Sequence, residues 1–221
     1  RADHTEFAPF LVVAPTSVVG NWAQEAARFV PGAKVVTITE STSKSGKSIA
    51  ELVQGAHLVL TSYALFRLDE DGYTEFGNHV PENAEKSTSP HAGWGALILD
   101  EAQFVKNTKT RAWKVARALN AQVKLAITGT PMENNLMELW ALLAIVADGL
   151  FPSARMFRDL YARPAESGED PQVIEKLRRR VRPLMLRRTK DVVAADLPEK
   201  NDVRVNVPLT TGHRHIYDMH L

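Results

Sequence analysis

Short apolar runs alternate with segments of helical periodicity along most of the chain. Each run has the length of a buried strand, and apolar side chains recur every three or four residues between the runs. This alternation predicts an α/β fold with a parallel sheet and right-handed crossovers. The expected strands are Phe10–Ala14, Val35–Thr39, His57–Thr61, Ala96–Asp100 and Val123–Thr128.

Helices are predicted between these strands. The first begins near Thr16 or Ser17, either of which can cap its N-terminus. Its apolar residues recur at helical spacing and predict one buried face: Val18, Trp22, Ala26 and Phe29. Further helices are expected at Ser48–Gln54, Ser62–Leu68 and Lys109–Asn120.

The second half of the chain has a different pattern. Residues 69–93 combine glycine, proline and polar residues, which predicts a mobile surface excursion. A helical apolar stripe follows: Leu136, Leu139, Trp140, Leu143 and Val146. Another helix is expected from about Pro171 to a point before Pro183, and Asp202–Val207 alternates as a strand does.

Composition is that of an ordinary globular domain, with 44% hydrophobic and 24% charged residues in 221. No apolar run is long enough to span a bilayer, so no membrane partner is expected. The absence of cysteine excludes disulfides and thiolate metal sites. The chain opens at Arg1 without a secretory leader, which we interpret as a fragment boundary.

The net charge of +1 argues against a uniformly basic surface for nucleic acid. The distribution of charge is uneven, however, because eight basic residues and no acidic residue lie between Lys176 and Lys190. This segment can attract phosphate or an acidic partner. The alternative is a solvated helix face.

Two strand ends carry candidate chemistry. The strand from Ala96 ends in the adjacent carboxylates Asp100 and Glu101, an arrangement that nucleotide hydrolases use to hold magnesium and orient a water. The strand before Thr128 ends in small hydroxyl and glycine residues that permit close approach of a phosphate. Both ends should meet at one edge of a parallel sheet. Alone, a carboxylate pair at a strand end is also a common helix cap.

Four segments, in order, resemble the motifs of the Swi/Snf-type family of superfamily 2 helicase-like ATPases. They are Leu11–Ser17, Leu58–Tyr63, Ala96–Val105 and Ala126–Pro131. The resemblance implies a RecA-like parallel sheet flanked by helices, with a helical protrusion. It also implies ATP and Mg²⁺ as cofactors.

The resemblance gives roles to the residues at the strand ends. Asp100 would order Mg²⁺, Glu101 would orient the attacking water or accept its proton, and Gln103 would contact the nucleotide or the coupling loop. The match to the coupling motif, which relays nucleotide state to the DNA side, is Thr128, Gly129, Thr130 and Pro131. Thr128 and Gly129 would also lie near the nucleotide.

Two further groups match the DNA-contact motifs of the family. The first is Pro15, Thr16, Ser17, Asn21 and Trp22, and the second is Thr61, Ser62 and Tyr63. The implied partner is double-stranded DNA, bound through phosphates without sequence preference, or a DNA-bound protein complex. Ordinary helix caps would have the same residues, and Trp22 is better explained as core.

The resemblance also predicts a domain organisation. Residues 1–134 would form the first lobe without its phosphate-loop segment, residues 135–200 the protrusion and inter-lobe segment, and residues 201–221 the return to that lobe and the entry to a second. The intact protein would be a DNA-dependent ATP hydrolase that moves along or remodels DNA complexes, while the isolated chain would be inactive. Its location would be the nucleus in a eukaryote or, as we favour, the cytoplasm of a bacterium in association with the nucleoid.

The segment Ser41–Ser48 imitates a phosphate-binding loop. It ends in Gly46, Lys47 and Ser48, but Ser41 stands where that loop needs glycine for a tight turn. We therefore expect a polar surface loop. Two alternatives stay open: a small P-loop NTPase or kinase that uses Lys47 and Ser48, and a DNA- or protein-binding scaffold without turnover.

Overall fold

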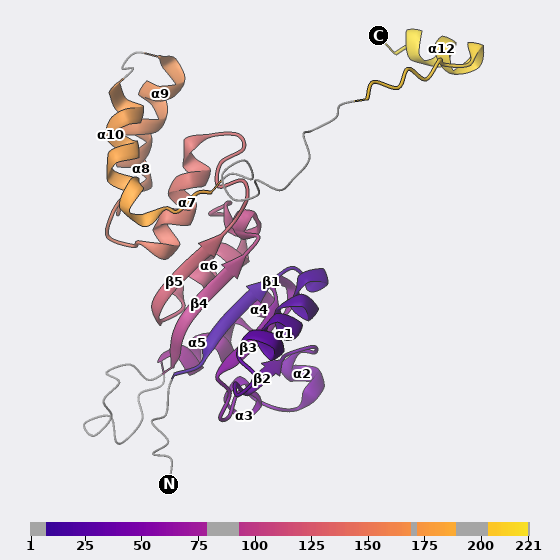
Figure 1. Cartoon of the computed structure of the whole chain (residues 1–221). Helices are drawn as coiled ribbons and strands as arrows, with labels where there is room; N and C mark the ends of the chain where they lie inside the picture. The colour runs from indigo at the N-terminus through magenta and orange to yellow at the C-terminus, as the bar shows by residue number, and fades with distance from the viewer. Residues whose placement is uncertain (1–7, 79–92, 169–171, 189–202, 221) are drawn as a thin grey trace. The chain divides into compact units, whose positions relative to one another are not determined.

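A sheet of five parallel strands in the order β2-β3-β1-β4-β5 organises the N-terminal part of the chain (Figure 1). The computed structural model describes residues 8–78, 93–168, 172–188 and 203–220. The strands are β1 (Phe10–Ala14), β2 (Val35–Thr37), β3 (Leu58–Ser62), β4 (Trp94–Asp100) and β5 (Ala121–Ile127). The predicted α/β class is confirmed, and the five strands predicted between Phe10 and Thr128 are present with ends shifted by at most two residues.

The central strands form the core because both of their faces are covered. In β1, Leu11, Val13 and Ala14 have no accessible surface, and β1 pairs with β3 on one side and β4 on the other. Parallel sheets covered on both faces have such continuous apolar strands. Strand β5 lies at the edge, where Val123 and Leu125 stay half exposed.

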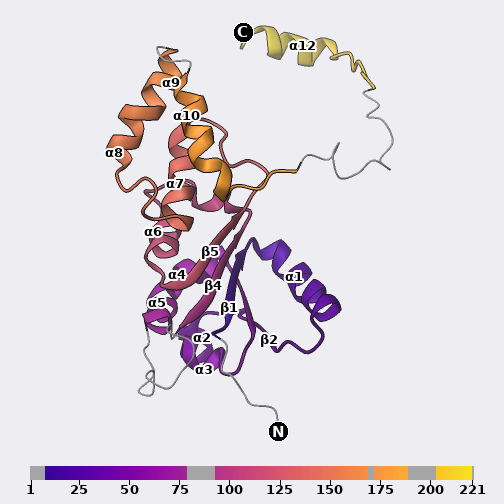
Figure 2. The same ribbon diagram turned by 60° about the vertical axis from the view of Figure 1, so that its left-hand side comes forward.

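Helices cover both faces of the sheet. The chain runs one way across the sheet from β1 to β2 and the other way from β2 to β5, so right-handed crossovers put α1 opposite α4–α6 (Figure 2). These helices are α1 (Thr16–Phe29), α2 (Thr42–Ser45), α3 (Ile49–Leu52), α4 (Tyr63–Leu68), α5 (Glu70–Asn78), η2 (Ala102–Val105) and α6 (Arg111–Ala118).

The chain becomes helical after β5, as predicted. Asn135 caps the apolar helix α7, and Phe151, Phe157 and Tyr161 form an aromatic cluster beyond it. Helix α7 is buried around most of its circumference, whereas the sequence predicted one stripe; Leu139 and Val146 are only half buried. These elements are α7 (Leu136–Val146), α8 (Ala154–Phe157), the π-helical η3 (Arg158–Ala162), α9 (Arg163–Ser167) and α10 (Gln172–Val181).

The chain divides into two compact units, residues 1–177 and 178–221. The second unit contains the end of α10, η4 (Arg182–Leu184) and α12 (Thr211–Asp218). The strand predicted at Asp202–Val207 is wrong over the described residues 203–207, which are exposed and form no strand. Alternating apolar residues form a strand only where a neighbour accepts their hydrogen bonds.

The surface excursion predicted for residues 69–93 is wrong over Glu70–Asn78, which form α5. Tyr73 of this helix is fully buried and donates a hydrogen bond from its hydroxyl to Thr61. Gly77 lets the helix approach Trp94 and the backbone of Asn120 closely. The glycines that suggested a loop therefore permit tight packing instead, and residues 79–92 lie outside the described residues.

Two expectations about α1 also need correction. Neither Thr16 nor Ser17 caps the helix, because Pro15 occupies the N-cap position and no side chain accepts a hydrogen bond there. The predicted buried face is only partly covered: Val18, Trp22 and Ala26 are half buried, and Phe29 is 68% exposed. Helix α1 is thus attached to the sheet through a narrow strip of contacts.

Gly95→Ala should destabilise the fold, because an added Cβ would lie 2.6 Å from the carbonyl oxygen of Ala8, beside β4. We expect a loss of about 1–3 kcal/mol in the free energy of unfolding, measured with urea on the purified chain. Gly20→Ala is the matched control, because its Cβ meets no atom within 4 Å. The higher helix propensity of alanine should raise the free energy of unfolding by about 0.5–1 kcal/mol. Equal effects of the two changes would contradict the packing described.

Candidate nucleotide and DNA site

The four strand ends singled out in the sequence meet at one edge of the sheet. Strands β1, β3, β4 and β5 run parallel, and Asp100 hydrogen-bonds residues that follow β1 and β3. Strands β1 and β4 are neighbours, yet the segments that follow them go to opposite faces. Such a switch point is where open α/β sheets bind ligands.

The carboxylate of Asp100 is held on both of its oxygens. Trp22 Nε1 of α1 donates to Oδ2 over 2.8 Å, and the backbone N–H of Glu101 donates to Oδ1 over 2.9 Å. Tyr63 donates its hydroxyl to the backbone carbonyl of Asp100 over 2.9 Å. Burial raises the pKa of Tyr63, and the charges of Asp100 and Glu101 raise it further, so Tyr63 remains a donor.

Glu101 has a strained backbone. With φ of +50° it is the one non-glycine residue in the left-handed region among the residues that the structure describes. A bulky residue in this conformation costs about 1–3 kcal/mol, and such outliers cluster at functional sites. The turn carries the chain out of β4 and leaves the Glu101 side chain half exposed at the sheet edge.

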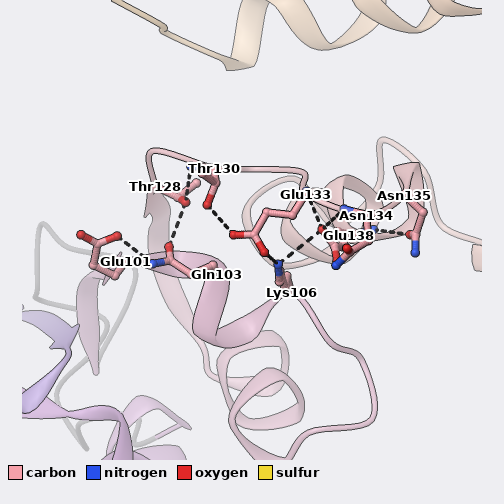
Figure 3. A network of polar contacts seen from close by, with 9 residues as sticks. All are labelled: Glu101, Gln103, Lys106, Thr128, Thr130, Glu133, Asn134, Asn135 and Glu138. Atoms are coloured by element: carbon pink, nitrogen blue, oxygen red, sulfur yellow. Dashed lines mark hydrogen bonds and ion pairs between the residues drawn. The ribbon is translucent and has the colours of Figure 1, made fainter. Parts of the chain in front are cut away.

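Gln103 connects Glu101 to the loop after β5 (Figure 3). Its amide Nε2 donates to Glu101 Oε2 over 2.9 Å, and its Oε1 accepts from the Thr128 hydroxyl over 3.0 Å. The carboxylate can only accept, which sets the orientation of the amide. The Thr128 hydroxyl also accepts from the backbone N–H of Thr130, so it acts as donor and acceptor at once.

The polar network continues to the start of α7 (Figure 3). Thr130 donates its hydroxyl to Glu133 over 2.9 Å, and Glu133 pairs with Lys106, which follows η2. Lys106 also lies 3.5 Å from a carboxylate oxygen of Glu138. Gly129 and Pro131 lie in this loop, where nothing would obstruct a Cβ at Gly129.

Glu138 holds the loop from the first turn of α7. Its carboxylate accepts from the backbone N–H groups of Glu133 and Asn134 and from the Asn134 side chain. Burial raises the pKa of Glu138, but these hydrogen bonds and the charge of Lys106 outweigh it and lower the pKa to about 2. Glu138 was not among the predicted site residues, although its position three residues after the cap Asn135 has the capping-box spacing that indicates such a role.

The first group of predicted DNA contacts lies at the N-terminus of α1. Thr16, Ser17 and Asn21 are exposed there, and Pro15 is half buried. The first backbone N–H groups of a helix lack intrahelical partners and suit phosphate oxygens. The position is compatible with DNA contact, which stays a prediction.

The second group of predicted DNA contacts makes hydrogen bonds and packing contacts inside the domain. The Thr61 side chain is fully buried and accepts the Tyr73 hydroxyl, so it does not reach the surface. Ser62 caps α4 by accepting from the N–H of Leu65, as the predicted helix start there requires. Tyr63 is buried, stacks on Phe104 and supports Asp100. The burial of Thr61 argues against a direct DNA contact by its side chain, while a contact by Ser62 or Tyr63 stays a prediction.

The segment Ser41–Ser48 is a surface segment, as expected. Its residues form α2 and the cap of α3, where the Ser48 hydroxyl and Glu51 make a capping box. Thr42 is anchored by Asp69, which follows α4, through hydrogen bonds of 2.7 and 3.1 Å. Lys47 is exposed, and within the described residues no hydrogen bond or ion pair joins this segment to Asp100.

The donor set at Asp100 suits magnesium better than a metal that needs several protein ligands. No group of three or more histidine, aspartate or glutamate side chains that could hold a metal lies within the described ranges. Mg²⁺ keeps several waters and is typically bound through one or two carboxylates and substrate phosphates. Asp100, with Glu101 beside it, supplies carboxylates of the kind that such binding needs. Across the residues that the structure describes, no helix is both long and apolar enough to cross a membrane.

Comparison with known protein families identifies the family of this chain. The family model for the SNF2-related domain matches residues 2–221. The chain belongs to this family. It is 34% identical over 212 residues to the putative ATP-dependent helicase/translocase YwqA of Bacillus subtilis, which covers 95% of this chain and 21% of YwqA. It is 33% identical over 223 residues to the chromatin-remodeling ATPase INO80 of Drosophila melanogaster, covering 95% and 13%.

Solved structures of the SNF2 family share the fold. The Sulfolobus solfataricus SWI2/SNF2 ATPase core in complex with dsDNA matches with a TM-score of 0.67 and 29% identity, over 96% of this chain and 41% of that one. A second structure, of the Sulfolobus solfataricus SWI2/SNF2 ATPase core domain, matches with a TM-score of 0.63 and 29% identity, over 97% of this chain and 40% of that one. The predicted RecA-like class and the Swi/Snf resemblance are confirmed. The chain spans about a fifth or less of the length of YwqA and INO80.

Glu138 should make stability depend on pH in the acid range. A carboxylate whose folded pKa is below its unfolded value near 4.5 contributes stability that is complete above that pH and is lost as pH falls toward 2. Glu138→Gln should therefore lower the midpoint of urea unfolding near pH 6. The decline of this midpoint between pH 6 and about pH 3 should be smaller in the variant than in wild type. Glu166→Gln, which changes an exposed carboxylate of α9, should leave the curve parallel to wild type. A parallel curve for Glu138→Gln would show that its hydrogen bonds do not stabilise the fold.

Proposed function

We propose that this chain is the first RecA-like lobe of an ATP hydrolase stimulated by double-stranded DNA. The observation that carries the proposal is the Asp100–Glu101 pair at the end of β4, supported by three donors and placed at the switch point of the sheet. The strained backbone of Glu101 supports it as well, because that conformation puts the carboxylate at the sheet edge. The enzymatic names of YwqA and INO80 agree with this chemistry.

Each residue of the site has a defined task in the proposal. Asp100 would hold Mg²⁺ directly or through water. When bound, this ion neutralises charge on the phosphate oxygens of ATP. Glu101 would orient the attacking water and accept its proton, and Gln103 would hold the Glu101 carboxylate in place through their 2.9 Å hydrogen bond.

The loop after β5 would couple nucleotide state to the rest of the protein. A movement of Glu101 would be transmitted through Gln103 to Thr128 and then to Thr130, because these four residues form one chain of hydrogen bonds. Gly129 and Pro131 shape the same loop. The connection to α7 through Glu133, Lys106 and Glu138 gives the loop a rigid support.

Duplex DNA is the proposed partner, bound through its phosphates. The N-terminus of α1 with Pro15, Thr16, Ser17 and Asn21 is one candidate surface, and the basic segment 176–190 is another, with the described arginines exposed. The dsDNA complex of the Sulfolobus solfataricus core supports this choice. We propose that hydrolysis drives movement along DNA, or remodelling of DNA–protein complexes, without strand separation.

The activity should belong to the larger protein. In the proposal, residues 1–134 contribute the first lobe, residues 135–200 the protrusion and inter-lobe segment, and residues 201–221 the entry to a second lobe. A phosphate loop and an arginine finger from elsewhere would complete the site, and such a finger contributes about three to five orders of magnitude. The isolated chain should therefore hydrolyse ATP poorly even with DNA present.

Glu101→Gln in the full-length protein should keep ATP binding and lower DNA-stimulated turnover by about two to four orders of magnitude, the usual contribution of a positioned base. The amide removes the proton acceptor but preserves the size of the side chain. Steady-state ATPase with saturating duplex DNA and nucleotide binding by fluorescence polarisation test this. Glu75→Gln, in α5, is the control and should retain wild-type turnover. Normal turnover of the Glu101 variant would remove Glu101 from the mechanism, and a wild-type protein without turnover would favour a scaffold.

Binding to duplex DNA should weaken steeply with salt and vary little with sequence, because phosphate contacts release counterions and read no bases. Arg179→Gln should reduce the slope of log affinity against log salt by about one, since one phosphate contact is lost. Ser17→Ala should weaken binding without changing the slope, because a neutral hydroxyl releases no counterion. Titrations at several salt concentrations measure both. A sequence preference that persists at high salt would contradict the proposed mode.

A further inference from the structure

The hydrogen bond from Trp22 to Asp100 joins two parts of the proposed machinery that are 78 residues apart in sequence. Trp22 lies in α1, whose N-terminus is the candidate DNA surface, and Asp100 is the candidate magnesium ligand. The helical spacing predicted Trp22 as a core residue. In the structure it is half buried and donates its indole N–H to the Asp100 carboxylate.

All four tryptophans donate their indole N–H, but only one donates to a carboxylate. Trp94, Trp113 and Trp140 donate to backbone carbonyls of Tyr73, Ala141 and Phe151, respectively. Those three bonds lie inside the core and serve packing. The 2.8 Å bond of Trp22 is charge-assisted, which makes it stronger than a neutral hydrogen bond.

The indole can orient Asp100 without displacing a metal. An ionised carboxylate has about four acceptor positions, and the N–H groups of Trp22 and Glu101 take one on each oxygen. At least one position on each oxygen is left for a metal or a metal-bound water. Partners that hydrogen-bond a ligating carboxylate set its orientation, and losing them typically costs about 10- to 100-fold in metal affinity or activity.

The bond is also the one polar attachment of α1 to the sheet edge. Within the described residues, no other side chain of Thr16–Phe29 hydrogen-bonds or ion-pairs outside the helix, and none is fully buried. A small shift of α1 therefore changes the Asp100 carboxylate through Trp22 before it disturbs the core.

We infer that Trp22 is a positioning residue, which orients Asp100 for Mg²⁺ and passes displacements of α1 on DNA binding to the metal site. This inference rests on the proposed function and adds to it a direct link between the DNA surface and the metal ligand. Trp22 itself touches neither nucleotide nor metal in this scheme.

The test compares Trp22→Phe with Trp113→Phe in the full-length protein. Both changes delete one indole N–H and keep an aromatic ring, but only the first removes a bond to Asp100. The probe is Mn²⁺ with a non-hydrolysable ATP analogue, and free Mn²⁺ is measured by electron paramagnetic resonance. We expect Trp22→Phe to raise the Mn²⁺ dissociation constant about tenfold or more, with metal-free analogue binding unchanged. Trp113→Phe should match wild type.

Duplex DNA provides the second measurement. In the wild type, saturating DNA should change the Mn²⁺ dissociation constant by about fivefold or more, in the range of typical coupling between sites. Trp22→Phe should abolish most of this change while DNA still binds. A Trp22→Leu variant checks that loss of the N–H, and not the shape of phenylalanine, is responsible.

Several results would overturn the inference. Mn²⁺ affinity within twofold of wild type in both Trp22 variants would show that the indole does not position Asp100. An unchanged DNA effect would overturn the role of α1. Absence of DNA-stimulated ATP hydrolysis in the wild type would instead contradict the proposed function, while the Mn²⁺ measurement would still decide the role of Trp22.

Discussion

The exit of β4 from the sheet is the constraint on which the site depends. Asp100 closes the strand in register with Ile127 of β5, and Glu101 then turns in the left-handed region, at an energetic cost. Three donors from α1, α4 and the Glu101 backbone hold this turn. Because the sheet is packed on both faces, the turn cannot relax by moving β4, so the backbone that carries the two carboxylates stays in place.

Around this turn, the apolar core and the polar network have different tasks. The core fixes where the strands end, since Leu97 and Leu99 of β4 are fully buried. The polar network sets the side chains beyond those ends, from Glu101 through Gln103 and Thr128 to the start of α7. A neutral hydrogen bond contributes about 0.5–1.5 kcal/mol to stability, and a hydrogen bond to a charged group about 1.5–3 kcal/mol. A network of such bonds can therefore rearrange with nucleotide or DNA while the sheet remains intact.

The sequence predicted what local pattern determines. Apolar runs located all five strands, and the adjacent carboxylates at Asp100 and Glu101 located the candidate site. What it missed depends on contacts between distant residues. In the sequence Gly77 favours a loop, but in the structure its lack of a side chain lets α5 pack closely against Trp94. Residues 203–207 alternate as a strand does but have no partner in the described structure. The hydrogen bond of Trp22 to Asp100 and the ion pair of Lys106 with Glu133 each join residues far apart in the sequence. No periodicity along the chain could therefore indicate them.

The weak attachment of α1 follows from these constraints and has a functional consequence. A helix bound to the sheet by a fully buried face would resist displacement, because moving it would expose apolar surface at about 25 cal/mol per Å². Helix α1 has no fully buried residue, so a small movement costs little. Its one polar link outside the helix, among the described residues, ends on Asp100. Phosphates bound at the N-terminus of α1 would thus displace a weakly attached helix. This displacement would first change the orientation of the Asp100 carboxylate, the proposed metal ligand.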